Sequence, residues 1–230
     1  MSTVQISDVR VVVFDLDDTL YPERSFAFSG FDAVAHWLQE RMDCPMDPAA
    51  RMRELFDTHD RSHVFDTLLA ELGCDRPKQM VKDMICVYRT HKPLIKLYDD
   101  ADRILSRLAG RFHLAVISDG PANVQQNKID ALGLQQRIDR IVLTDIWGPT
   151  FWKPHPRAYL EIERIWDYRD SSCLYIADNA EKDFKAPLKL GWQTIQIRRP
   201  DGVYAHTIAT TGSEPHQVIT TLDQVNLTSR

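Results

Sequence analysis

The chain reads Val11-Val12-Val13-Phe14-Asp15-Leu16-Asp17-Asp18-Thr19 near its start. Four apolar residues, three of them β-branched, predict a short strand that is buried on both faces of a sheet. Side chains alternate along extended backbone, so Asp15 and Asp17 are expected to point to the same side just beyond the strand. Two neighbouring carboxylates repel each other unless a cation lies between them or one of them holds a proton. The pair therefore suits a nucleophile or metal ligand beside an acid–base group, although an acidic turn after a strand is the simpler alternative.

Similar apolar runs predict further buried strands at 112–117, 138–143, 173–176 and 194–197, with a weaker one at 217–219. Stretches with the 3.6-residue period of a helix lie between these strands, at 101–108, 124–132 and 158–166. Strands that alternate with helices indicate right-handed crossovers and a parallel sheet covered by helices on both faces. We therefore expect an α/β fold with a doubly wound parallel sheet.

Residues 21–97 interrupt this alternation, because they have the pattern of helices only. Phe31, Val34 and Leu38 share one helical face, and Asp47-Pro48 predicts a helix start with an Asp N-cap and a first-turn proline. One helix suffices to connect two parallel strands, so this insertion is too long for a crossover. The sequence therefore predicts two parts: an α/β core formed by 1–20 and 98–230, and an all-helical cap formed by 21–97 over the end of the first strand.

The composition excludes several classes of protein. The 230 residues are 43% hydrophobic and 27% charged, which is typical of a globular protein with an ordinary core. The 28 basic and 33 acidic residues give a net charge of −5, so we expect no binding of nucleic acid polymers through a general basic surface. No apolar run approaches the length of a membrane span, residues 1–10 have no signal-peptide core, and the four cysteines form no C-x-x-C pair. We expect a reduced, cytoplasmic protein without membrane contact, as a monomer or homodimer.

Polar side chains also follow three later strands. Ser118-Asp119-Gly120 ends the second strand, Lys153 follows the third, and Asp178 ends the fourth, with Asp183 five residues further on. A hydroxyl and backbone N–H groups in a glycine-containing turn can hold a phosphate oxygen, and carboxylates suit Mg²⁺. Because ligands bind at the carboxyl ends of parallel strands, these groups are expected beside the first acidic pair. Such a set meets the needs of phosphoryl transfer, which are positioning and charge neutralisation.

The ordered set Asp15-Leu16-Asp17-Asp18-Thr19, Ser118, Lys153 and Asp178 with Asp183 resembles the four motifs of the haloacid dehalogenase (HAD) superfamily. The helical insertion after the first motif is similar to the type I cap of that superfamily, and the resemblance covers nearly the whole chain. It implies a Rossmann-like core and a Mg²⁺-dependent phosphatase that hydrolyses a small soluble phosphomonoester, of the sugar phosphate or nucleotide class, through an aspartyl-phosphate. One departure is Ala177, where many members have glycine, and we expect only a slight backbone adjustment there.

The resemblance also implies a role for each matching position. Asp15 would attack the phosphoryl group, and Asp17 would protonate the leaving oxygen and then activate water. Mg²⁺ would be bound by Asp15, Asp178 and the backbone carbonyl of Asp17. The predicted substrate-binding residues are Thr19, Ser118, Asp119 and Lys153. Lys153 would also neutralise the nucleophile, and Asp183 would orient Lys153 or a metal-bound water without binding the metal itself.

Other functions remain open at this level. A phosphomutase would use the same groups, and a non-catalytic phospho-binding module is disfavoured because Asp15, Asp17, Lys153 and Asp178 are all present. A hydrolytic dehalogenase lacks the acid–base carboxylate two residues after the nucleophile, so Asp17 disfavours that activity. The stretch His59-Asp60-Arg61-Ser62-His63 is similar to a two-histidine metal motif, but a polar cap face or a substrate contact is the favoured interpretation.

Overall fold

The computed structural model describes residues 3–58 and 61–228. Contacts within the chain divide it into two units. One unit consists of Met1–Glu23 and Lys96–Arg230, and the other of Arg24–Ile95. The boundaries fall three residues after the predicted position 20–21 and two before the predicted position 97–98. We call the first the α/β unit and the second the helical unit.

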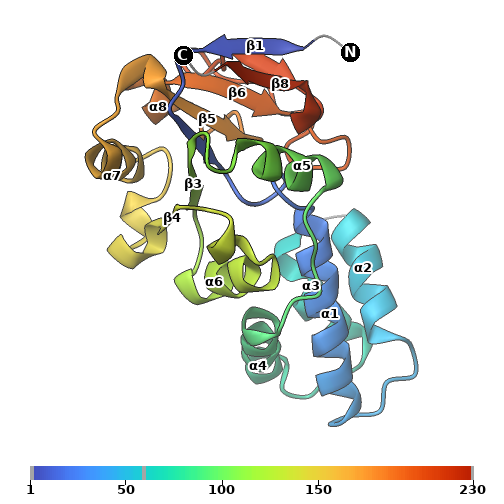
Figure 1. Cartoon of the computed structure of the whole chain (residues 1–230). Coiled ribbons are helices and arrows are strands. Elements are labelled where there is room, and N and C mark those ends of the chain that lie inside the picture. Colours follow the sequence, from blue (N-terminus) through green and yellow to red (C-terminus); the bar gives the residue numbers. More distant parts are fainter. Residues whose placement is uncertain (1–2, 59–60, 229–230) are drawn as a thin grey trace. The chain divides into compact units, whose positions relative to one another are not determined.

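Six parallel strands form the main sheet of the α/β unit, in the order β4-β3-β2-β5-β6-β7 (Figure 1). Their bounds are β2 Val11–Phe14, β3 His113–Ser118, β4 Arg140–Leu143, β5 Cys173–Ala177, β6 Gln193–Ile197 and β7 Gln217–Ile219. The doubly wound parallel sheet is therefore confirmed, with every predicted strand within two residues of its expected bounds. The chain runs outward from the central strand β2 in both directions, so the strand order reverses beside β2, which is where open α/β sheets bind ligands.

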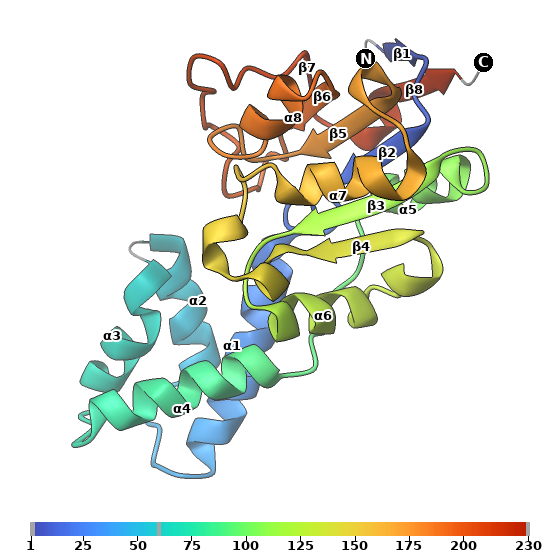
Figure 2. The ribbon, with the colours of Figure 1, turned by 90° about the vertical axis from the view of Figure 1, so that its left-hand side faces the viewer.

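Helices cover both faces of this sheet. The helices of the unit are α5 Asp99–Leu108, α6 Ala122–Ala131, α7 Arg157–Trp166 and α8 Lys185–Lys189. Figures 1 and 2 show α5 and α7 on opposite sides of the strands. Buried side chains of α7, such as Tyr159 and Ile162, pack in one cluster with Val11 and Val13 of β2. Because β2 is covered on both faces, its apolar run shows no alternation with polar residues.

A separate pair of parallel strands was not predicted from the sequence. β1 Val4–Ser7 and β8 Val225–Thr228 pair only with each other. β1 buries Ile6 alone and β8 buries Val225 and Leu227, while most of the other side chains are exposed. With so few apolar positions in four residues, the pattern carries too little signal to identify a strand.

The helical unit has a core of its own. Its helices are α1 Glu23–Gln39, which begins one residue before the boundary, α2 Pro48–Thr58, α3 Val64–Glu71 and α4 Pro77–Thr90. Phe31, Val34 and Leu38 of α1 are buried together, as their spacing predicts. The predicted helix start is also confirmed, because the Asp47 carboxylate accepts hydrogen bonds from the Ala49 and Ala50 N–H groups at 2.9 and 3.2 Å. No helix among residues 3–58 and 61–228 is both long and apolar enough to cross a membrane.

A buried ion pair fixes α5 to the carboxyl end of the sheet. Arg199, which follows β6, donates to both oxygens of Asp100 on α5 at 2.6 and 3.0 Å, and stacks 3.9 Å from the Tyr98 ring centre. The Asp100 carboxylate also accepts hydrogen bonds from the Thr221 hydroxyl and the Leu222 N–H. Burial alone would raise the pKa of Asp100, but its hydrogen bonds and the Arg199 charge outweigh burial and hold that pKa below its usual range.

Replacing Asp100→Asn should therefore lower the free energy of unfolding by about 3–5 kcal/mol at neutral pH, since it leaves the buried Arg199 without its counter-ion. Because the folded pKa of Asp100 is depressed, its contribution is present above the unfolded pKa of about 3.9 and is lost as the pH falls through the folded value. Urea unfolding from neutral to acidic pH measures both effects. Asp99→Asn, at the exposed neighbouring position, is the control, and equal unfolding free energies for the two variants would contradict this account.

Candidate active site

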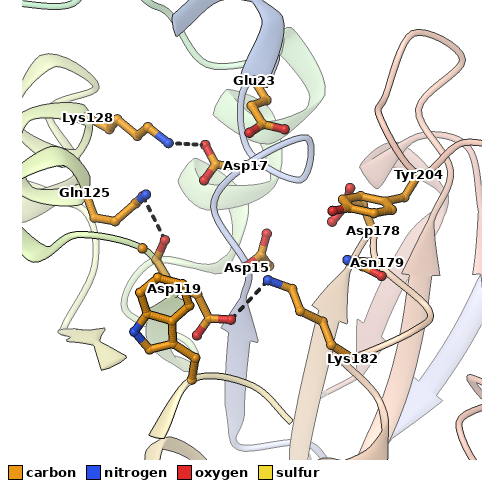
Figure 3. Close-up of a pocket in the computed structure, with 13 residues that line it drawn as sticks. Asp15, Asp17, Glu23, Asp119, Gln125, Lys128, Asp178, Asn179, Lys182 and Tyr204 are labelled. Atoms are coloured by element: carbon orange, nitrogen blue, oxygen red, sulfur yellow. Dashed lines mark hydrogen bonds and ion pairs between the residues drawn. The ribbon is translucent and has the colours of Figure 1, made fainter. Parts of the chain in front are cut away.

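A pocket of about 250 Å³ lies at the carboxyl edge of the sheet in the α/β unit (Figure 3). The structure brings five of the predicted site residues to its wall: Asp15, Asp17, Ser118, Asp119 and Asp178. Ser118 is the last residue of β3, and the other four come from the segments that follow β2, β3 and β5, which are neighbours in the sheet. Gly120 of the predicted glycine-containing turn also lines the pocket. The remaining wall residues were not among the predicted site residues: Glu23, Gln125, Lys128, Trp152, Asn179, Lys182 and Tyr204.

Asp15 is buried and paired with a lysine. Lys153 donates a hydrogen bond from its Nζ to Asp15 Oδ1, lies 2.8 Å from Asp183 Oδ1, and donates to the Tyr175 hydroxyl at 3.1 Å. Burial raises the pKa of Asp15 to about 7, although the Lys153 charge opposes that shift. Lys153 itself is buried and does not line the pocket, and its predicted contact with a bound phosphoryl group stays a prediction.

Asp183 contacts Lys153 and is itself held by the backbone of Asn179. Its Oδ2 accepts a hydrogen bond from the Asn179 N–H at 3.2 Å, and its own N–H donates to the Asn179 carbonyl at 3.0 Å. The side chain is fully buried and does not reach the pocket. The geometry is consistent with the expected role of Asp183 in orienting Lys153.

The predicted metal ligands are oxygen atoms, which suit a hard divalent cation such as Mg²⁺. Asp15 and Asp178 are both buried, and burial raises the pKa of Asp178 well above its usual range, with the negative charges of Asp15, Asp183 and Asp18 adding to the effect. A cation between the two carboxylates would remove this repulsion. Within the described part of the chain no three His, Cys, Asp or Glu side chains form a metal-binding group. The predicted set needs only two carboxylates and one backbone carbonyl, and Mg²⁺ commonly completes its shell with water and substrate phosphate.

Asp17 is held by two groups that sequence reasoning did not identify. The amine of Lys128 on α6 donates to Asp17 Oδ1 at 2.7 Å, and the Tyr21 hydroxyl donates to the same oxygen. Lys128 is buried, and its amine lies 5.9 Å from the Tyr21 ring centre. Figure 3 shows the contact of Lys128 with Asp17, and together the two hydrogen bonds fix the position of the Asp17 carboxylate at the pocket.

A glutamine of α6 bonds to Ser118 and lies close to Gly120. The Ser118 hydroxyl donates to Gln125 Oε1 at 2.9 Å. Gly120 has a φ of 109°, and a Cβ at this position would come within 2.8 Å of Gln125 Nε2. The turn therefore requires glycine for its backbone conformation and for the close approach of Gln125.

Asp18 links the first motif to a loop that supplies another wall residue. Its Oδ1 accepts a hydrogen bond from the Glu23 N–H and its Oδ2 accepts one from the Val203 N–H, both at 2.8 Å. The next residue along the loop, Tyr204, lines the pocket. Asp18 has a φ of 49°, a conformation that Asp and Asn adopt more readily than most residues. This helps to explain why an acidic residue occupies the position.

The structure does not bring Thr19 to the pocket, and it leaves the two-histidine stretch untested. Thr19 is fully buried and the structure does not bring it to the pocket wall, while its carbonyl accepts a hydrogen bond from Arg199 at 2.9 Å. His59 and Asp60 lie outside the described residues, so the two-histidine stretch is not tested. His63 is exposed, with its Nδ1 2.9 Å from the Ser62 hydroxyl.

Comparisons with known proteins agree with the fold and motifs. A glyceraldehyde 3-phosphate phosphatase from Methanopyrus kandleri is 26% identical over 200 residues, covering 83% of this chain and 84% of the relative. An N-acylneuraminate-9-phosphatase from Rattus norvegicus is 22% identical over 94% of this chain and 92% of its own length. Among solved structures, the putative HAD-hydrolase YfnB from Bacillus subtilis bound to magnesium has a TM-score of 0.67 and 19% identity, covering 94% of this chain and 96% of that one. It shows a shared fold.

The family model for haloacid dehalogenase-like hydrolases matches residues 12–197, which is most of the chain. The matched range contains Asp15, Asp17, Ser118, Lys153 and Asp178, the positions on which the resemblance rests. The prediction of the family is confirmed, and the protein belongs to the haloacid dehalogenase-like hydrolase family.

Proposed function

We propose that this protein is a Mg²⁺-dependent phosphomonoester hydrolase that acts on a small phosphorylated metabolite through an aspartyl-phosphate formed on Asp15. The observation that carries the proposal is the arrangement of Asp15 and Asp17 at one pocket. Asp15 is held by the amine of Lys153, and Asp17 by that of Lys128. The curated relatives reported above are named as phosphatases, which favours hydrolysis over the alternatives of a phosphomutase or a binding module.

In the first step, an oxygen of the Asp15 carboxylate attacks the phosphorus atom, and the bond from phosphorus to the ester oxygen breaks. Asp17 donates a proton to that departing oxygen, so an alcohol leaves. Lys153 favours the anionic form of Asp15 that this attack requires, because its ammonium group contacts the carboxylate. Lys128 and Tyr21 hold the Asp17 carboxylate in place between its proton transfers.

In the second step, a water molecule attacks the phosphorus atom of the aspartyl-phosphate. Asp17 accepts a proton from this water, the bond from phosphorus to the Asp15 oxygen breaks, and inorganic phosphate leaves. In both steps the Ser118 hydroxyl, turned from Gln125 toward the substrate, and the N–H groups of the glycine turn are proposed to hold the phosphoryl oxygens. Mg²⁺ held by Asp15, Asp178 and the Asp17 carbonyl would neutralise charge on the phosphoryl group.

The proposal predicts that Asp15→Asn abolishes hydrolysis while the protein stays folded. Phosphate release is measured with Mg²⁺ from a panel that includes glyceraldehyde 3-phosphate, N-acylneuraminate 9-phosphate, a hexose phosphate and a nucleoside monophosphate. Circular dichroism and urea unfolding check that the variant keeps its fold. Near-normal turnover by Asp15→Asn would contradict the assignment of the nucleophile, and a folded wild-type protein without activity on any phosphomonoester would contradict the proposed reaction.

The predicted metal site can be tested without turnover. Mg²⁺ that binds the folded protein at a hundredfold excess over its dissociation constant should stabilise it by about 2.7 kcal/mol, which raises the melting temperature. Asp178→Asn should lose most of this Mg²⁺-dependent shift. Asp167→Asn is the matched control, because that carboxylate is 92% exposed and its φ of 55° suits asparagine. A wild-type melting temperature that does not respond to Mg²⁺, or an equal response in Asp178→Asn, would refute the metal assignment.

A further inference from the structure

Three lysines lie at the carboxyl edge of the sheet, and they differ in how far their side chains are exposed. The side chain of Lys153 is 1% exposed and that of Lys128 is 5% exposed, and each is committed to a carboxylate of the first motif. Lys182 is 37% exposed and lines the pocket, where its amine lies 3.0 Å from Asp119 Oδ2 (Figure 3). Lys182 is therefore the lysine of this set whose ammonium group a ligand in the pocket can reach most readily.

The charge of the pocket wall favours a role for such a cation in binding an anionic ligand. The carboxylates in the wall belong to Asp15, Asp17, Glu23, Asp119 and Asp178, and the ammonium groups in it belong to Lys128 and Lys182. A phosphate monoester that carries up to two negative charges has to bind beside these carboxylates, of which the proposed Mg²⁺ site uses Asp15 and Asp178. An accessible ammonium group beside the nucleophile would reduce the repulsion and donate a charged hydrogen bond to a phosphoryl oxygen.

The Asp119 carboxylate holds the amine of Lys182 in position. Its Oδ1 accepts hydrogen bonds from the Thr144 hydroxyl at 2.7 Å and the Lys153 N–H at 3.1 Å, so one side of the carboxylate is fixed by neutral donors. Its Oδ2 accepts from Lys182. Asp119 is nearly buried, and as an anion it is poorly suited to contact a phosphate directly. The geometry therefore indicates a positioning role for the Asp119 carboxylate, in place of the predicted substrate contact.

The backbone of Lys182 is also held in place. Lys182 directly precedes Asp183, whose N–H and carboxylate both bond to the backbone of Asn179. The turn 179–183 thus fixes the start of the lysine side chain, and Asp119 fixes its amine. A side chain tethered at both ends loses less conformational freedom when it binds a ligand.

We propose that Lys182 is a substrate-binding residue that donates a hydrogen bond from its ammonium group to a non-bridging phosphoryl oxygen, and that Asp119 positions it. The inference rests on the proposed function, since it adds a residue to the same phosphoryl site. The ammonium group keeps its proton throughout, so it stabilises charge without taking part in proton transfer. The simpler alternative is that Lys182 only neutralises the buried Asp119 carboxylate.

Four variants separate these two roles: Lys182→Met, Lys182→Arg, Asp119→Asn and the double variant Lys182→Met with Asp119→Asn. Lys182→Met should lower kcat/KM by about 10- to 100-fold, mainly through a higher KM, because one charged hydrogen bond to the phosphoryl group is lost. Lys182→Arg should retain most of the activity. Lys189→Met, at an exposed lysine of α8, is the matched control and should behave like the wild-type protein.

The dissociation constant of inorganic phosphate, measured by calorimetry in the presence of Mg²⁺, should rise by a similar factor in Lys182→Met. This readout needs no turnover, so it tests the inference even if the true substrate is absent from the panel. The double variant should remain impaired, because removing the Asp119 charge does not replace the lost contact.

Two results would overturn the inference: unchanged phosphate affinity in Lys182→Met, or recovery of wild-type affinity in the double variant, which is the result expected from charge neutralisation alone. A wild-type protein that binds phosphate through Lys182 but hydrolyses no phosphomonoester would contradict the proposed function and leave the binding role intact. An active wild-type protein with an unaffected Lys182→Met variant would contradict only the role of Lys182.

Discussion

The contact of the Lys153 ammonium group with Asp15 and Asp183 sets the charge balance on which the rest of the site depends. All three side chains are almost inaccessible to water, so each charge would be strongly disfavoured alone. Asp183 is fixed by the backbone of Asn179, and Lys153 in turn holds the Asp15 carboxylate. The two carboxylates come from segments that follow adjacent parallel strands, β2 and β5. A cation site, a nucleophile and a phosphoryl pocket can therefore form at one sheet edge.

The main sheet could be predicted from the sequence because its strands are buried on both faces. Val11-Val12-Val13-Phe14 has no polar residue at any position, and such a run has few alternatives to a central strand. The pair β1 and β8 escaped prediction for the opposite reason, since most of their outward side chains are exposed and each strand is only four residues long. The strands of the main sheet could be predicted because burial on both faces makes every position apolar, which strand propensity alone does not require.

In the candidate site, residues at the ends of strands could be predicted from the sequence, whereas a residue that only helix packing brings to the site could not. The five predicted wall residues lie at the carboxyl ends of β2, β3 and β5 or within three residues of them, so their convergence follows from sheet topology. Lys128 could not be identified in this way, because it lies within α6 and only the packing of that helix brings its amine to Asp17. Thr19 belongs to the first motif, and its place there predicted a substrate contact. In the structure it is buried, does not line the pocket, and accepts a hydrogen bond from Arg199 through its carbonyl.

Trapping the covalent intermediate tests the central claim most directly. Wild-type protein is mixed with its best phosphomonoester and Mg²⁺, quenched in acid within a single turnover, and digested for mass spectrometry, with Asp15→Asn as the control. The account predicts that the peptide containing Asp15 gains the mass of one phosphoryl group in the wild-type sample only, at the Asp15 side chain. An active protein in which the phosphoryl group is found on another residue, or on none while the substrate turns over under conditions that preserve acyl phosphates, would contradict the account.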